Sequence, residues 1–133
     1  MDKTQVQTRS KAFGLAIIDF CETLPKSGAR GVISRQLLRS GTSVGANYRA
    51  ACHARSRADF VSKMGIVAEE ADESQYWMEL LVEGSLCRKD AVEHLMREAY
   101  ELASIAVASI NTARRREAKS QITNHKSQIG VDA

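Results

Sequence analysis

The segment that decides the fold is FVSKMGIVAEEADESQYWMELL, residues 60–81. Within it, apolar or small side chains alternate in steps of four and three residues, which is the heptad pattern of packed helices. They are Phe60, Met64, Val67, Ala71, Ser74, Met78 and Leu81. Before them, Ser56 and Asp59 have the spacing of a capping box, and Gly84 is a natural terminator after them. The sequence therefore predicts one helix of about 28 residues, roughly 42 Å long, which needs partner helices along its length.

Three further helices are predicted around this one. Residues 5–22 carry an apolar stripe that ends before Pro25, because proline disfavours a helical conformation at the residue before it. A second helix is predicted over residues 32–54, and another over residues 90–113, with Asp90 and Glu93 in capping-box spacing. Short connections place such helices next to each other in antiparallel order. We therefore expect an all-α domain over residues 1–113, an antiparallel up-down-up-down four-helix bundle.

The helix expected over residues 32–54 carries a run of small residues beside its apolar face. They are Ser40, Gly41, Ser43, Gly45 and Ala46. Each glycine inside a helix costs about 1 kcal/mol relative to alanine. A helix that keeps Gly41 and Gly45 gains close approach of its backbone to a neighbour. This pattern predicts tight helix packing and does not indicate a catalytic or ligand-binding site.

Charge is distributed unevenly along the chain, although the formal net charge is only +3. Residues 26–57 contain seven Lys and Arg and no acid, whereas residues 58–83 contain seven acids against Lys63. Arg35, Arg39 and Arg49 fall within an arc of roughly 80° opposite the apolar face of their helix. They could neutralise phosphates of RNA or DNA. They could equally pair with the acidic helix of the same or a neighbouring subunit, and the sequence leaves both readings open.

The sequence carries no pattern typical of catalysis or of a metal site. An acidic cluster on the third predicted helix consists of Glu69, Glu70, Asp72 and Glu73. Di-metal bundles combine such acids with Glu-x-x-His motifs, and this chain has none. Cys52 adjoins His53, but neighbours in a helix point about 100° apart and cannot form a nucleophile–base pair. We therefore expect no enzymatic activity, no metal and no cofactor.

Composition indicates a cytoplasmic protein that is not embedded in a membrane. No apolar run approaches the roughly 20 residues of a membrane span, and the polar N-terminal residues do not resemble a secretory signal. Cys21, Cys52 and Cys87 are odd in number and lack metal-ligand spacing, which suits a reducing compartment. Acidic residues flank Tyr76 and Trp77, so we expect these rings at a helix or subunit contact rather than stacked on bases.

Residues 114–133 differ in composition from the predicted bundle. The run KSQI at residues 119–122 recurs at residues 126–129, and two copies are too few for a repeat fold. Arg114, Arg115 and Arg116 follow the fourth predicted helix, where positive charge favours a helix C-terminus. We expect these residues to form a basic, disordered tail.

Three stretches of the chain resemble a known bacterial family. They are LLRSGTSVGANYRA (residues 37–50), DF (residues 59–60) and EADESQYW (residues 70–77). They are similar to the four-helix-bundle proteins encoded in intervening sequences of 23S ribosomal RNA genes, over about residues 10–112. Another common form of the motif reads Asn-Ile-Ala-Glu-Gly where this chain has NYRAA at residues 47–51. The glutamate is absent, with Ala50 at its position, and the arginine at position 49 makes the local surface more basic.

The resemblance implies an up-down-up-down bundle that assembles into a homopentamer. Related bundles are accessory proteins of diversity-generating retroelements, in which a basic surface contacts nucleic acid and a reverse transcriptase. Ser43 and Asn47 carry over as polar members of the structural motif, with Asn47 expected to form a hydrogen bond within the bundle.

Two functional hypotheses follow from the sequence. In the first, a non-enzymatic homo-oligomer binds RNA or DNA through Arg35, Arg39 and Arg49. In the second, the basic second helix and the acidic third helix serve subunit assembly, with no role in nucleic-acid binding.

Overall fold

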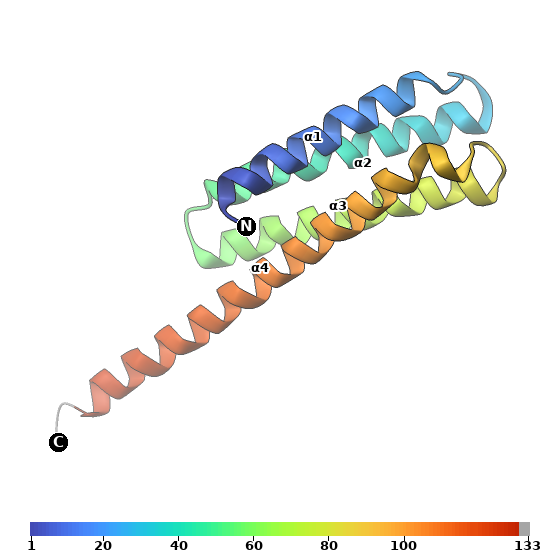
Figure 1. Cartoon of the computed structure of the whole chain (residues 1–133). Coiled ribbons are helices and arrows are strands. Elements are labelled where there is room, and N and C mark those ends of the chain that lie inside the picture. Colours follow the sequence, from blue (N-terminus) through green and yellow to red (C-terminus); the bar gives the residue numbers. More distant parts are fainter. Residues whose placement is uncertain (131–133) are drawn as a thin grey trace.

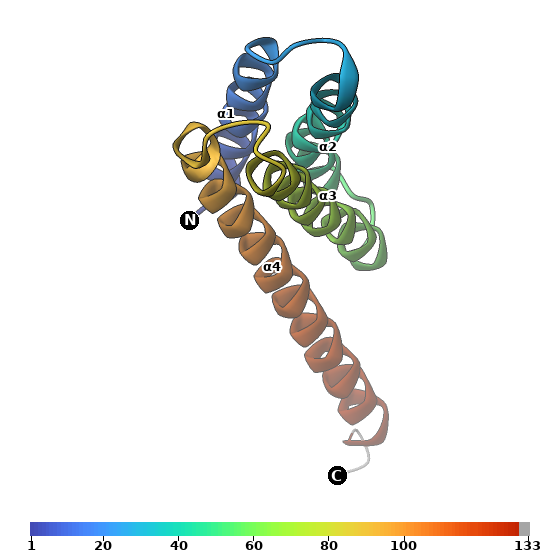
Figure 2. The same ribbon diagram turned by 90° about the vertical axis from the view of Figure 1, so that its right-hand side faces the viewer.

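The computed structural model describes the backbone of residues 1–130 and the side chains of residues 1–125. Over residues 1–130 the chain folds into four helices and no strand: α1 (Lys3–Glu22), α2 (Gly28–Cys52), α3 (Arg57–Glu83) and α4 (Lys89–Gly130). Consecutive helices run antiparallel (Figure 1). Each packs along its neighbour in the sequence, and α1 touches α4 more sparsely. The predicted all-α, up-down-up-down four-helix bundle is confirmed, with α1 and α2 on one side and α3 and α4 on the other (Figure 2).

The helix boundaries follow local capping groups. Helix α1 begins at Lys3, two residues before the predicted start, because Asp2 and Gln5 form a capping box with hydrogen bonds of 2.8 and 2.9 Å. Helix α3 begins after Ser56, whose side chain accepts a hydrogen bond from the Asp59 N–H, as its sequence predicts. These caps satisfy N–H groups that a helix start otherwise leaves without partners.

The end of α3 differs in one detail from the sequence prediction. The helix does stop at Glu83, with Gly84 as its C-cap. The left-handed conformation that closes it belongs to Ser85, with φ of 58°. The Leu86 N–H donates to the Leu81 carbonyl at 2.7 Å and the Ser85 N–H to the Val82 carbonyl at 3.0 Å, which is the Schellman pattern.

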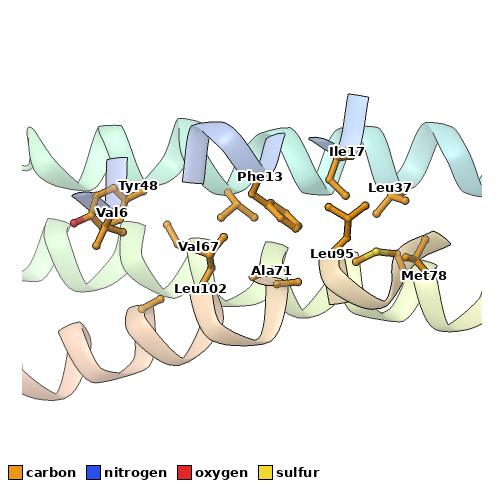
Figure 3. Packing of buried hydrophobic residues seen from close by; sticks show 14 of the residues in the cluster. Val6, Phe13, Ile17, Leu37, Tyr48, Val67, Ala71, Met78, Leu95 and Leu102 are labelled. Atoms are coloured by element: carbon orange, nitrogen blue, oxygen red, sulfur yellow. The ribbon is translucent and has the colours of Figure 1, made fainter. Parts of the chain in front are cut away.

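The core is built around the predicted face of α3. Six of its residues are buried: Met64, Val67, Ala71, Ser74, Met78 and Leu81. Figure 3 shows side chains of all four helices meeting there, among them Phe13 of α1, Leu37 of α2 and Leu102 of α4. Ser74 is the polar member of this face, and its hydroxyl lies 2.9 Å from that of the equally buried Ser40 on α2. Both hydroxyls also lie within hydrogen-bond distance of carbonyl groups of their own helices, so the pair is satisfied.

Helices α1 and α2 pack through the small residues that the sequence singled out. A Cβ atom on Gly41 would lie 2.8 Å from both Cγ atoms of Ile17, and one on Gly45 would lie 3.2 Å from the Ser10 carbonyl group. Ile17 is fully buried, so it has no free space into which to move. The close backbone approach predicted from Gly41 and Gly45 is confirmed.

Helix α4 is longer than the sequence predicted. We expected it to end near residue 113, with a disordered tail beyond, whereas it continues as a helix to Gly130. Ala113 is the last buried residue among the described side chains, and residues 114–125 are exposed. Neither glycine nor proline occurs between Gly84 and Gly130, so no local signal stops the helix after the core ends. Residues 131–133 of the expected tail lie outside the described residues.

Candidate interfaces on the two sides of the bundle

The three predicted arginines lie on the outer surface of α2, and all are exposed. Arg35 and Arg39 are one turn apart, and Arg49 lies about 15 Å further along the helix. Because α2 lies between α1 and α3, residues on its two flanks meet different helices. Arg39 extends toward α3, where it meets Glu70 and Glu73, whereas Arg49 lines a hollow shared with α1.

Arg39 is held by two glutamates of α3. Its Nη1 lies 3.1 Å from Glu70 Oε2, and its Nη2 pairs with Glu73. Half-exposed pairs of this kind contribute about 0.2–1 kcal/mol each. Helices α2 and α3 are therefore matched in charge within one chain, which is one of the two roles the sequence left open for these arginines.

Arg35 and Arg49 have different surroundings. Arg35 donates to the Lys26 carbonyl oxygen at 3.4 Å, a contact that leaves its charge uncompensated. Among the residues with described side chains, neither Arg35 nor Arg49 forms an ion pair. Arg39 is thus paired within the chain, whereas Arg35 and Arg49 are available to a partner.

A shallow hollow runs along the outer surface between α1 and α2. Its lining includes Gly14, Thr42, Gly45 and Ala46, which leave no large side chain to fill the space. Apolar and basic side chains surround these small residues: Leu15, Ile18, Lys11 and Arg49. Leu15 is 56% exposed, which is unusual for leucine on a packed helix. We call this surface the α1/α2 face; it combines apolar contact area with positive charge.

The outer surface between α3 and α4, on the opposite side of the bundle, combines apolar contact area with negative charge. Two hollows between α3 and α4 share Gln75 and Tyr100, and exposed Val107 lines one of them. Tyr100 is 63% exposed and Tyr76 is 50% exposed. Four exposed acids follow the outer surface of α3 without an ion-pair partner among residues 1–125: Glu69, Asp72, Glu79 and Glu83. We call this surface, with its tyrosines and acids, the α3/α4 face.

The two aromatic residues of α3 have different positions. Trp77 packs against the core, as expected for a helix contact, and its ring meets that of Tyr76 edge to face with centroids 5.2 Å apart. Its buried indole N–H has no hydrogen-bond partner among the described side chains and backbone. Tyr76 projects outward from the same helix and is half exposed.

One ion-pair cluster was not anticipated from the sequence. Arg9 of α1 donates to Glu98 of α4 at 2.6 and 2.7 Å and also pairs with Glu101. Hydrogen bonding to Glu98 raises the pKa of Arg9 above its ordinary value. The cluster joins the two helices that pack most sparsely. No sequence signal identifies it, because its members lie 89 and 92 residues apart.

The polar motif residues on α2 bond within their own helix. The Asn47 Nδ2 donates to the Ser43 carbonyl at 2.9 Å, and the Ser43 hydroxyl donates to the Arg39 carbonyl at 2.7 Å. Both contacts link residues one turn apart, so both side chains find their hydrogen-bond partners within α2.

The described residues can be examined for metal ligands and for reactive thiols. No three of their His, Cys, Asp and Glu side chains are grouped so that they could hold a metal ion. Burial raises the pKa of the Cys21 thiol and of the Cys87 thiol, which disfavours the reactive thiolate at both. Among helices in the described part of the chain, none has the length and apolar character needed to cross a bilayer.

These features define a four-helix bundle with two outer faces of opposite charge. The family of 23S rRNA-intervening sequence proteins matches residues 2–108, and the chain belongs to this family. A solved structure from Bacteroides thetaiotaomicron, described as a protein of unknown function from the S23 ribosomal protein family, is similar to the chain. The two are 34% identical with a TM-score of 0.75, over 84% of this chain and 99% of the other. No curated protein matches the sequence.

Proposed function

We propose that the protein is a non-enzymatic, self-assembling bundle in which the α1/α2 face of one copy binds the α3/α4 face of the next. One observation supports this proposal above all: a single chain has two outer surfaces that complement each other in apolar area and in charge. Leu15 and Ile18 on one side match Tyr100 and Val107 on the other in apolar character. Basic residues surround the first surface, and acids predominate at the second, where Arg97 lines one hollow and lies 3.8 Å from Glu93.

The location of the two faces determines the kind of assembly. They lie on opposite sides of the bundle, so a contact between them is heterologous, and it produces a closed ring if the rotation closes. The family resemblance implies a ring of five copies. Such an assembly would work in the cytoplasm, where the free thiols of Cys21, Cys52 and Cys87 remain reduced.

Mixing two face-blocked variants tests this arrangement. Ala46→Glu places a bulky negative charge in the α1/α2 hollow, and Tyr100→Glu does the same on the α3/α4 face. Native mass would be measured by light scattering after gel filtration. Each variant alone is expected to be monomeric. Their equimolar mixture is expected to form a heterodimer, because each variant retains the face that the other has lost.

A matched control is Ala29→Glu, an exposed alanine in the first turn of α2 and outside both faces. It is expected to retain the native mass of the wild-type protein. A monomeric wild-type protein would contradict self-assembly. A mixture that remains monomeric would contradict the pairing of these two faces.

A second candidate function is nucleic-acid binding by the arginine face of α2. The observation that favours it is the exposure of Arg35 and Arg49 without carboxylate partners among the described side chains. Arg39 is a weaker candidate, since Glu70 and Glu73 already bind its guanidinium. This function competes with assembly, because a copy bound to the α1/α2 face would cover Arg49.

Salt-dependent binding of a labelled RNA hairpin tests the second candidate. Arg35, Arg39 and Arg49 would all be changed to glutamine, and the affinity measured in rising salt. If they contact phosphates, the slope of log K against log salt should fall by about 0.7–0.9 per lost contact. Equal slopes for the variant and the wild-type protein would exclude this role.

A further inference from the structure

The part of α4 beyond the bundle has no role in the assembly described above. Among the side chains described through residue 125, Ala113 is the last buried one of α4, and the helix continues to Gly130. We call residues 114–130 the arm. At 1.5 Å per residue it is about 25 Å long. Its first turn still lies against the start of α3, where Arg57 pairs with Glu117, and Figure 1 shows the rest projecting past the connection between α2 and α3. It also lies outside the family match, which ends at residue 108.

The arm carries a concentration of positive charge. Arg115, Arg116 and Lys119 are exposed, and none of them forms an ion pair among the residues with described side chains. Glu117 is the acid in this stretch, and Arg57 of α3 already pairs with it at 3.0 Å. At about 100° per residue, Arg115 lies roughly 160° from Ala113 and Lys119 roughly 120° from it. Both therefore point away from the bundle, and Arg116, roughly 60° from Ala113, is exposed as well.

The composition of the arm identifies the chemistry of its partner. Ile122 and Ile129 are the two large apolar residues of the arm, fewer than the three to four per two turns that make an apolar stripe. A membrane surface or a second helix needs such a stripe to bury. A polyanion needs only exposed positive charge, and a phosphate backbone supplies the matching charge at regular intervals.

The shape of the arm narrows the choice among nucleic acids. A single α-helix is about 10–12 Å in diameter, which fits the roughly 12 Å wide major groove of B-form DNA. The major groove of double-stranded RNA is deep and too narrow for side chains to read. We propose that the arm binds duplex DNA by placing its helix in the major groove, with Arg115, Arg116 and Lys119 against the phosphates. This binding does not depend on the self-assembly proposed above.

Fluorescence anisotropy with a labelled DNA duplex of about 30 base pairs, roughly three helical turns, tests the arm directly. The full chain would be compared with a variant whose Arg115, Arg116 and Lys119 are changed to glutamine, a residue that keeps the helix. Losing three phosphate contacts should reduce the slope of log K against log salt by about 2.7. At about 0.1 M salt, the affinity should fall at least about tenfold.

A control variant makes the same change in net charge elsewhere. It replaces three exposed cations at the opposite end of the bundle with glutamine: Lys26, Arg88 and Lys89. This control is expected to retain most of the wild-type affinity. Gel filtration should give the arm variant the same native mass as the wild-type protein, which separates failure of the arm from failure of assembly.

Four results would overturn the proposal. The first is an equal salt slope for the arm variant and the wild-type protein, and the second is an equal loss of DNA affinity in the control variant. The third is equally tight binding of a duplex RNA of the same sequence. The fourth is binding of anionic lipid vesicles in preference to DNA. The first two would exclude the three cations as a phosphate site. The third would exclude the major-groove fit, and the fourth would assign the arm to a membrane surface.

Discussion

The two flanks of α2 hold their neighbours by different means. Toward α1, the contact depends on the absence of side chains: Gly41 and Gly45 let the backbones approach until Ile17 and Ser10 fill the space. Toward α3, it depends on polar pairing, with the buried hydroxyls of Ser40 and Ser74 and the exposed ion pairs of Arg39. In the contact with α1, an added Cβ atom at Gly41 would force Ile17 to shift. In the contact with α3, removal of each polar group should lower the free energy of unfolding by a small amount.

The largest expected effect is on the α1 flank. Gly41→Leu forces side-chain atoms into the space occupied by Ile17, and overpacking of this kind costs about 3 kcal/mol. The free energy of unfolding would be measured in urea at a fixed protein concentration. Adding Ile17→Ala to Gly41→Leu should recover part of the loss, because it reopens the space. A variant as stable as the wild-type protein would show that this contact can adjust.

Gly65 supplies the matched control for that prediction. It also lies inside a helix, but a Cβ atom there would meet nothing within 4 Å. Gly65→Ala is therefore expected to increase the free energy of unfolding by about 0.5–1 kcal/mol, through helix propensity alone.

A smaller effect is expected from the buried hydroxyl pair on the α3 flank. Ser74→Ala removes one partner of Ser40 and should cost about 1 kcal/mol. The double change of Ser40 and Ser74 to alanine should cost less than the sum of the two single changes, because it leaves no hydroxyl without its cross-helix partner. A double-mutant cycle in urea would measure this difference. Strict additivity would mean that the two hydroxyls do not interact across the helices.

The exposed ion pairs of the same flank should contribute less. Arg39→Gln is expected to lower the free energy of unfolding by about 0.2–1 kcal/mol, and the loss should disappear in roughly 1 M salt, which screens exposed charges. Arg35→Gln is the control, since no carboxylate pairs with Arg35 among the described side chains. An equal loss from both variants would point to helix propensity as the cause instead of the pairing with Glu70 and Glu73.

The last effect is absent at neutral pH and concerns the interior between the two flanks. Burial raises the pKa of Tyr48 to about 12, above the ordinary value of 10. Because the folded state favours the protonated phenol, the resulting stabilisation is complete below about pH 10 and is lost as the pH rises through about 12. An absorbance titration of the phenolate band should show an ionisation step near pH 12 that Tyr48→Phe removes. The same change at exposed Tyr100 should leave that step in place.

The sequence alone determined the four helices and the packing of the bundle. The heptad spacing in residues 60–81 predicted the core face of α3, and Gly41 and Gly45 predicted the close approach of α2 to a neighbour. These features could be predicted because helix periodicity and steric fit depend on residues three and four positions apart, and such spacing is visible in the chain. Gly84 predicted the end of α3 for the same local reason, although Ser85 takes the left-handed conformation.

Only the tertiary structure decided how the charged residues are used. The sequence placed Arg35, Arg39 and Arg49 on one face but could not assign their partners, because Arg39 meets Glu70 and Glu73 only where two helices pack together. The cluster of Arg9 with Glu98 and Glu101 joins distant parts of the chain for the same reason. The helical arm was also missed, since a polar segment with no buried face has no apolar period from which a helix can be read.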